Sequence, residues 1–225
     1  MSEEHSGLTG FSGVARLFPL PNLVLFPRVM QPLHIFEARY RQLTADALAG
    51  DRLIAMALLR DQWDKDYDGN PAIHPVACLG KIVADQRLDD GRYHLMLRGM
   101  GRVRIVREIP GPQPYRRAEV ALLADVEITK HERQRWRRRL LTAVTRWFDD
   151  KGGVQKDLHK VLTSKMPLGA LADILSFALP LSLQTKQRQL DEIDVERRLE
   201  CLLAHLPAEE PSSTERKFPP GFSLN

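Results

Sequence analysis

The chain has 225 residues, of which 43% are hydrophobic and 28% charged, an ordinary composition for a globular protein that buries a core. Its 33 lysines and arginines barely exceed its 29 aspartates and glutamates, so the formal net charge of +4 does not demand a polyanionic partner. Two distant cysteines, no signal peptide and no run approaching ~18 apolar residues predict a soluble cytoplasmic protein without a membrane partner.

The first half of the chain has a residue pattern typical of β-strands. Residues 1–13 are rich in glycine and serine and are expected to be disordered. From 14 to 125, short apolar runs such as Leu53–Leu59 alternate with clusters of proline, glycine and aspartate, as strands alternate with turns. Within this half one helix is predicted over residues 35–49, because apolar side chains recur there at helical spacing and Gly50 stands where a helix would end.

A long hairpin is the clearest local prediction in this half. It spans Leu79–Val106 and turns at Asp89–Gly91, where glycine can adopt the positive φ of a tight turn. After the turn, apolar residues alternate with arginine and histidine. That alternation predicts a strand with one buried face and one basic face.

The second half, residues 126–207, has the pattern of a helical bundle. Glycine and proline mark the helix ends, because proline lacks the N–H that a helix interior requires. The predicted helices span residues 129–150, 154–164, 167–179 and 183–206. The polar, proline-rich residues 208–225 are expected to form a disordered tail.

Three groups of short motifs occur in order along the chain. The first is Leu17-Phe18-Pro19-Leu20, Leu25-Phe26-Pro27 and Pro32-Leu33-His34-Ile35-Phe36-Glu37. The second is Gly80-Lys81-Ile82-Val83, Leu97-Arg98-Gly99 and Arg102-Val103-Arg104-Ile105. The third is Leu179-Pro180-Leu181, Lys186-Gln187, Leu190-Asp191 and Val195-Glu196-Arg197-Arg198-Leu199. Together they resemble the N-terminal, substrate-recognition domain of Lon-type proteases, over about residues 14–206.

This resemblance implies an α+β fold. An N-terminal PUA-like β pseudo-barrel with one inserted helix (residues 14–125) is followed by a C-terminal α-helical bundle (residues 126–207). In full-length Lon proteases the region precedes an AAA+ ATPase and a Ser–Lys protease domain, and it helps to capture unfolded or damaged substrates. A stand-alone module of this kind is the expected form of the protein.

The sequence offers no match to the family's catalytic motifs. A phosphate-binding P-loop needs Gly-Lys-Ser/Thr after a glycine-rich turn, whereas Gly80-Lys81 is followed by Ile82. Ser164-Lys165 is an adjacent pair, and adjacency in sequence does not supply a positioned nucleophile and base. We therefore expect a non-enzyme without a cofactor.

An apolar run near the N-terminus is the candidate peptide-binding surface. Nearby prolines keep it from ordinary central strand pairing, and methionine adapts to varied partners. The candidate residues are Leu23, Val24, Leu25, Phe26, Val29 and Met30. The alternative is that these side chains are part of the core, as strand-length apolar runs usually are.

An arginine-rich helix is the second candidate surface. Its residues are Arg133, Arg135, Arg137, Arg138 and Arg139, which flank Trp136. Helical periodicity places most of these arginines on a solvated face. Arg133 and Arg137 fall toward the apolar side, where they would lie along hydrophobic surface, pair with acids of a neighbouring helix or line a groove. The functional alternative is a nucleic-acid patch with Trp136 as a stacking surface, extended by a basic strand around Arg98, Arg102 and Arg104.

No metal site is expected. Residues 64–70 imitate the start of an EF-hand loop, but the twelfth position, which should be a bidentate glutamate, is Pro75. His74 and Cys78 lack the further ligands that zinc requires.

Three functional hypotheses follow from these patterns. The first is a non-catalytic module that recognises unfolded or exposed-hydrophobic polypeptide segments, as an accessory to quality control or to an AAA+ protease acting in trans. The second is an RNA-binding PUA-like protein that uses the arginine helix. The third is a peptidase-family member by descent only. Salt separates the first two, because phosphate contacts weaken steeply as salt rises whereas hydrophobic capture does not.

Overall fold

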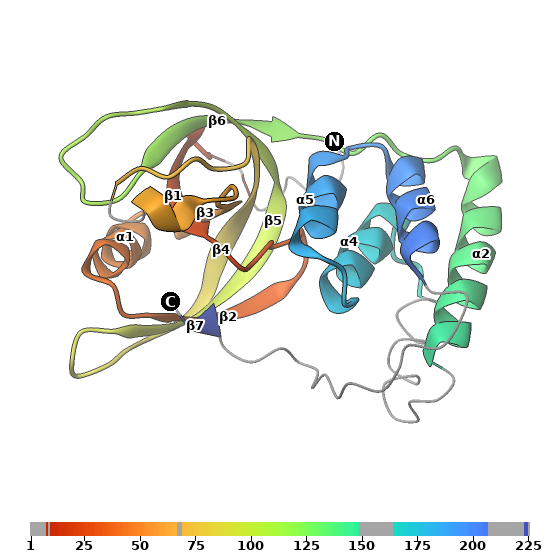
Figure 1. Ribbon diagram of the computed structural model, residues 1–225, viewed down its shortest axis with the longest axis horizontal. Helices are drawn as coiled ribbons and strands as arrows, with labels where there is room; N and C mark the ends of the chain where they lie inside the picture. Colours follow the sequence, from red (N-terminus) through yellow and green to blue (C-terminus); the bar gives the residue numbers. More distant parts are fainter. Residues whose placement is uncertain (1–7, 9, 67–68, 149–163, 207–222, 225) are drawn as a thin grey trace. The chain divides into compact units, whose positions relative to one another are not determined.

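The structure is a computed structural model that describes the chain except for residues 1–7, 9, 67–68, 149–163, 207–222 and 225. The chain divides into two compact units (Figure 1). One comprises residues 1–124 and 221–225, and the other comprises residues 125–220. No helix in the described ranges combines the length and the apolar character needed to cross a membrane.

The first unit is built mainly from strands. Its strands are β1 (Val14–Leu20), β2 (Met30–Ile35), β3 (Leu53–Leu58), β4 (Val76–Arg87), β5 (Tyr93–Glu108), β6 (Arg117–Leu123) and β7 (Ser223–Leu224). Its helices are α1 (Ala38–Leu48) and the short 3-10 helix η2 (Trp63–Asp66).

Five of these strands close into a ring. β1 pairs in parallel with β3 and antiparallel with β6, β3 pairs with β4, and β5 pairs with both β4 and β6. The first half of the long strand β5 extends beyond the ring, and there it pairs with β2, whose outer edge carries β7 (Figure 1). The predicted α+β class with a PUA-like β pseudo-barrel is confirmed.

The ring interior is filled by small and branched side chains, as expected where few strands enclose little space. The buried cluster comprises Leu8, Ala15, Leu17, Leu53, Ala55, Ala57, Ala77, Leu79, Val103, Ala118 and Val120. Outside the ring, Phe18 of β1 meets Tyr40 of α1 edge to face, with ring centroids 4.3 Å apart. β1 is therefore largely buried on both faces, because α1 packs against its outer side.

The helix predicted over residues 35–49 is confirmed, but it begins later. Ile35 is still part of β2, where it pairs with Tyr93, and Phe36 is 42% exposed and does not lie on a buried helix face. α1 starts at Ala38 and ends at Leu48, with Gly50 donating its N–H to the carbonyl of Ala47 at 3.1 Å. The strand pairing therefore determines where the helix starts.

The predicted hairpin is present as β4 and β5. Gly91 has φ of 80°, as its turn position requires, and the Arg92 N–H donates to Asp90 Oδ1 at 3.0 Å. A second glycine, Gly99 in β5, allows the backbone of Phe26 and Pro27 to pass close by. A Cβ added there would lie 2.0 Å from the Phe26 carbonyl oxygen.

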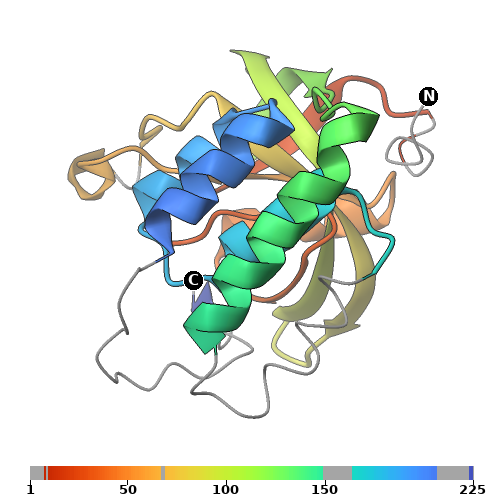
Figure 2. The same ribbon diagram turned by 90° about the vertical axis from the view of Figure 1, so that its right-hand side faces the viewer.

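The second unit is helical among its described residues. It contains α2 (Lys130–Phe148), α4 (Leu168–Ala178), α5 (Leu183–Asp191) and α6 (Val195–His205). α2 and α6 pack side by side, as Figure 2 shows. Their shared core comprises Ile128, Trp136, Leu140, Val144, Leu168, Leu171, Ala172, Leu175, Leu179, Val195, Leu199 and Leu202.

The helix predicted from Pro167 is confirmed as α4, with Pro167 at its N-cap. The single helix predicted over residues 183–206 is wrong, because the chain breaks between α5 and α6. Asp194 caps α6 by accepting from the N–H groups of Glu196 and Arg197 at 2.9 and 3.3 Å. The backbone at the break also pairs with Val126, whose N–H donates to the Ile193 carbonyl at 2.9 Å. The predicted helix over 154–164 lies outside the described residues.

A buried cluster of charges joins three segments of this unit. The Arg198 side chain is 0% exposed and donates to Asp173 Oδ1 at 2.7 Å and also to Asp125. Gly169 leaves the space for this cluster, because a Cβ there would lie 2.6 Å from Asp125 Oδ2.

Two segments expected to be disordered contribute ordered residues. Leu8 is 6% exposed and belongs to the cluster inside the ring, and Ser223–Leu224 form β7 beside β2. Most of the predicted tail lies outside the described residues.

Candidate functional site

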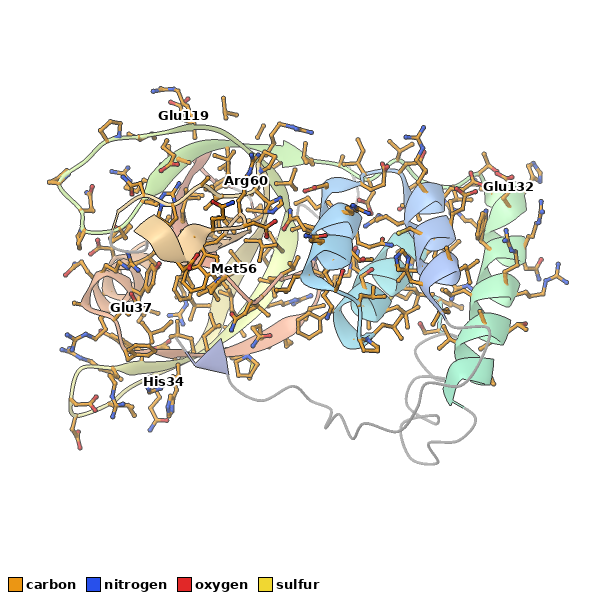
Figure 3. The ribbon with its side chains drawn as sticks, viewed as in Figure 1. His34, Glu37, Met56, Arg60, Glu119 and Glu132 are labelled. Atoms are coloured by element: carbon orange, nitrogen blue, oxygen red, sulfur yellow. The ribbon has the colours of Figure 1, made fainter. Side chains whose placement is uncertain are left out.

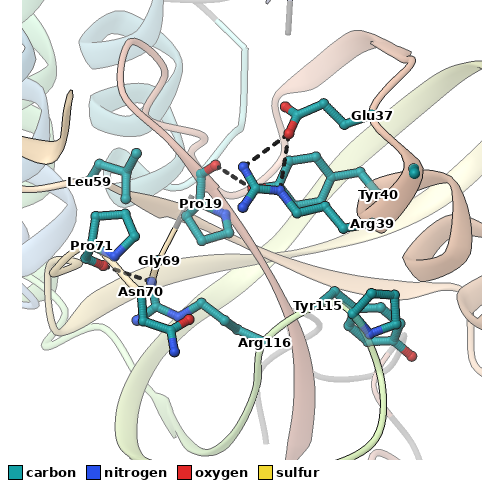
Figure 4. A pocket seen from close by; sticks show the side chains of 12 residues that line it. Pro19, Glu37, Arg39, Tyr40, Leu59, Gly69, Asn70, Pro71, Tyr115 and Arg116 are labelled. Carbon is teal, nitrogen blue, oxygen red and sulfur yellow. Dashed lines mark hydrogen bonds and ion pairs between the residues drawn. The ribbon is translucent and has the colours of Figure 1, made fainter. Parts of the chain in front are cut away.

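A surface groove of about 670 Å³ lies in the first unit (Figure 4). It is formed by the end of β1, the start of α1, the chain after η2 and the segment before β6. Its lining residues are Pro19, Glu37, Ala38, Arg39, Tyr40, Leu59, Gly69, Asn70, Pro71, Pro114, Tyr115 and Arg116. In Figure 3, Glu37 marks the α1 side of the groove.

Two tyrosines give the groove fixed aromatic walls. Tyr40 is 6% exposed, and its hydroxyl donates to the Pro19 carbonyl at 3.4 Å. Tyr115 is 8% exposed, and its hydroxyl donates to Asp46 Oδ2 at 2.6 Å. Burial, together with the hydrogen bond to the Asp46 carboxylate, raises the pKa of the Tyr115 phenol above its usual value. Both rings are therefore held in place.

Two arginines border the groove, and each already has a carboxylate partner. Arg39 pairs with Glu37 at 2.9 Å, and its guanidinium carbon lies 4.8 Å from the centre of the Tyr40 ring. Arg116 donates Nε to Glu108 Oε2 at 2.8 Å and Nη1 to the Pro71 carbonyl at 2.7 Å. Paired guanidiniums are weak sites for a free anion, so the lining suits a ligand with apolar groups and carbonyls.

The apolar run proposed for peptide binding is mostly buried. Four of its six side chains are at most 7% exposed: Val24, Leu25, Phe26 and Val29. Backbone bonds fasten the run to β5, since the N–H of Gly99 donates to the Val29 carbonyl at 2.8 Å. Met30 is 46% exposed and Leu23 is half-buried, so these two alone give the run surface area. The core interpretation fits the four buried residues.

Trp136 on α2 has no free face for stacking. It is 3% exposed, its Nε1 donates to Glu196 Oε1 at 3.2 Å, and the Arg139 guanidinium lies 4.3 Å from its ring centre. This burial removes the stacking part of the nucleic-acid interpretation.

The two arginines predicted toward the apolar side of α2 bind backbone carbonyls. Arg137 donates to the carbonyl of Ser164 at 2.7 Å and to that of Met166, and so holds the chain that leads into α4. Arg133 donates Nε to the Ile128 carbonyl at 3.1 Å. Both contacts stabilise the fold of the second unit.

Three arginines remain on an exposed face of α2. Arg135, Arg138 and Arg139 border a shallow hollow of about 570 Å³ that Thr142, Ala143 and Leu203 complete. On β5, Arg98 and Arg104 are exposed, whereas Arg102 is 3% exposed.

The structure brings together no metal-ligand set among its described residues. None of them forms a group of three or more histidine, cysteine, aspartate or glutamate side chains that could hold a metal ion. Asp64 lies in η2, and Tyr67 and Asp68 of the EF-hand-like segment lie outside the described residues. Gly80-Lys81 lies in β4, not in a loop before a helix.

The groove was not found from the sequence. Its walls come from separate stretches around residues 19, 37–40, 69–71 and 114–116. The nearest signal was the concentration of proline and tyrosine at Pro110–Tyr115, which typifies a loop and does not show that it meets α1.

A closed strand ring with one covering helix, a separate helical unit and a surface groove define a two-unit protein of the α+β class. The chain belongs to the family described as the ATP-dependent protease La (LON) substrate-binding domain, whose model matches residues 14–208. The resemblance seen in the motifs is thereby confirmed.

The chain is also similar in sequence to Lon proteases of several bacteria. The Lon protease of Desulfosudis oleivorans is 26% identical over 190 residues, which cover 84% of this chain and 23% of that protein. The Lon protease of Dictyoglomus thermophilum is 27% identical over 196 residues, covering 87% and 24%. The chain therefore spans about a quarter of the length of these curated relatives.

Two solved structures have the same fold. The Lon N-terminal domain protein from Xanthomonas campestris superposes with a TM-score of 0.62 at 27% identity, covering 86% of this chain and 99% of that one. The N-terminal domain of a Mycobacterium avium complex Lon protease gives 0.69 at 17% identity, covering 85% and 96%.

Proposed function

We propose that the protein is a non-catalytic module that binds unfolded or exposed-hydrophobic polypeptide segments in the groove beside α1. The observation that carries this proposal is the lining itself: two fixed tyrosine rings and several prolines, bordered by arginines. Rigid aromatic and proline surfaces lose little side-chain entropy on binding.

The family supports a polypeptide as the ligand. The matching family is described as the substrate-binding domain of the ATP-dependent protease La (LON), and the relatives are named Lon proteases. We place the module as an accessory to quality control or to an AAA+ protease acting in trans. Purified protein is then expected to hydrolyse neither ATP nor peptide, and sustained turnover by the pure chain would contradict the non-catalytic assignment.

Blocking the groove tests where the polypeptide binds. Ala38 is exposed at the start of α1 and lines the groove, so Ala38→Trp fills it. Loss of one buried apolar side chain removes about 1.5–3 kcal/mol of binding energy, which is about tenfold or more in Kd. The probe is a fluorescent, reduced and carboxymethylated polypeptide, and the readout is anisotropy.

The matched control is Ala49→Trp, since Ala49 is exposed at the other end of α1 and does not line the groove. We expect it to bind as the wild type does, with affinity that holds or strengthens as salt rises. Equal affinities for Ala38→Trp and Ala49→Trp would remove the groove from the proposal. No binding by the wild type would overturn the function.

The exposed arginines of α2 support a second candidate function, the binding of nucleic-acid phosphates. Arg135, Arg138 and Arg139 lie on one face within about one helical turn of each other. Substituting all three with glutamine should abolish binding of a single-stranded RNA probe and its steep salt dependence. RNA binding that is absent, or unchanged by these substitutions, rejects this candidate.

A further inference from the structure

The outer edge of β2 is an open strand edge outside the ring. Its inner edge pairs with β5 along its whole length, from Met30 opposite Arg98 to Ile35 opposite Tyr93. On the outer edge, among the described residues, only Leu33 and His34 have strand partners. An open edge presents backbone N–H and C=O groups that another extended chain can pair with.

One face of β2 beside this edge is partly apolar and accessible. Met30, Pro32 and His34 alternate onto the same face, and Phe36 follows at the same spacing. Met30 and Phe36 are 46% and 42% exposed, and they flank the strand at its two ends. An extended segment laid along β2 would find apolar contacts at both ends of the edge.

A buried polar atom on β2 also has no partner. Gln31 is 2% exposed, its Nε2 donates to the carbonyl of Pro32 at 2.7 Å, and its Oε1 accepts no hydrogen bond. The side-chain amide therefore lies against the backbone of its own strand with an unused acceptor. A buried acceptor without a donor is costly, so Gln31 lowers the stability of β2 in its present pairing.

The chain itself supplies the present occupant of the edge. β7 adds to β2 in parallel, with Ser223 opposite Leu33 and Leu224 opposite His34. Figure 1 shows β7 as a short arrow against β2, and Figure 3 marks His34 there. Among the residues that the structure describes, β7 pairs with two of the six residues of β2.

We propose that the outer edge of β2 is a strand-acceptor site, separate from the groove, and that Ser223–Leu224 occupies it in cis as an internal competitor. A longer extended polypeptide segment displaces β7, because it pairs with more of β2 on either side of Pro32, which has no N–H, and contacts Met30 and Phe36. The displacement by a client rests on the proposed polypeptide-binding function. The acceptor edge itself does not.

A reversible cross-link tests the competition. His34→Cys with Leu224→Cys, made in a Cys201→Ser background, places two thiols at paired positions, while Cys78 is buried. Oxidation fixes β7 on the edge, and reduction releases it. The oxidised protein should lose a large part of its affinity for the fluorescent unfolded polypeptide, and reduction should restore it. His34→Cys with Cys201→Ser, treated in the same way, should not respond to the oxidant.

A second probe tests the edge independently of any client. A synthetic peptide of residues 217–225 should bind to the Leu224→Pro chain, in which proline removes the N–H of the competing strand, and should not bind to the oxidised cross-linked chain. Equal binding of this peptide to both forms, or to neither, overturns the acceptor edge. Unchanged polypeptide affinity on cross-linking overturns the competition and leaves the groove proposal standing. Absence of all polypeptide binding with intact peptide binding removes the proposed function alone.

Discussion

Replacing Arg198 by methionine should remove about 3–5 kcal/mol from the unfolding free energy of the second unit, because it leaves two buried carboxylates without their cation. The side chains of Arg198, Asp173 and Asp125 are 0%, 3% and 7% exposed, so water cannot replace the lost contacts. Methionine keeps an apolar stem of similar length, so the substitution leaves only a small cavity. The lost stability then comes mainly from removal of the guanidinium charge.

Urea unfolding followed by far-ultraviolet circular dichroism measures this loss. The matched control is Arg197→Met, because Arg197 is 71% exposed and lies 3.8 Å from its partner Glu192. Such a surface pair contributes about 0–1 kcal/mol. Adding Asp125→Asn and Asp173→Asn to Arg198→Met should regain most of the lost stability. Equal values for Arg198→Met and Arg197→Met, or no recovery in the triple variant, would refute the electrostatic reasoning.

Three further outcomes concern other elements. Gly99→Ala should destabilise the first unit by about 3 kcal/mol in thermal unfolding, since the added Cβ would lie 2.0 Å from the Phe26 carbonyl oxygen. Gly101→Ala is the control and should be nearly neutral, because the nearest atom to its Cβ lies at 3.9 Å. Asp194→Ala should lower the unfolding free energy of the second unit by about 1 kcal/mol through loss of the α6 cap, measured by urea unfolding. Burial, with smaller contributions from His94 and Arg92, lowers the pKa of His34 below 6.5, so the folded state binds fewer protons there than the unfolded state. The unfolding free energy should therefore fall as pH falls from 6.5 through the lowered pKa, and urea titrations of His34→Gln should lack that part of the slope.

The parts of the fold that the sequence predicted are those with local signals. Alternating residues and a glycine turn at Asp89–Gly91 predicted the hairpin, and Pro167 predicted the start of α4. The errors arose where distant pairing decides the outcome. Phe36 has helical spacing with Tyr40 and Leu43, but Ile35 before it completes β2 and the helix starts later. Ile193 interrupts a helical pattern because its carbonyl accepts from the Val126 N–H.

In the candidate site, too, the sequence predicted local features but not those that depend on distant contacts. An apolar pattern around Phe26 predicts hydrophobic character but does not distinguish core from surface, and the structure buries most of that run. Helical periodicity placed Arg137 correctly toward the apolar side, yet its partners are backbone carbonyls, which leave no trace in residue type. The groove requires Tyr40 of α1 and Tyr115 of the loop before β6 to line the same hollow, and only tertiary structure shows that.

The position of β1 in the ring has a consequence for synthesis on the ribosome. β1 is flanked by β3 and by β6, and Val14 pairs with Glu119, about a hundred residues later in the chain. One edge of an apolar strand therefore waits unpaired while the intervening chain is translated. At about 5–20 residues per second this interval lasts several seconds. During that interval β1 is itself an exposed apolar segment, the kind of ligand that the proposed function assigns to the folded module.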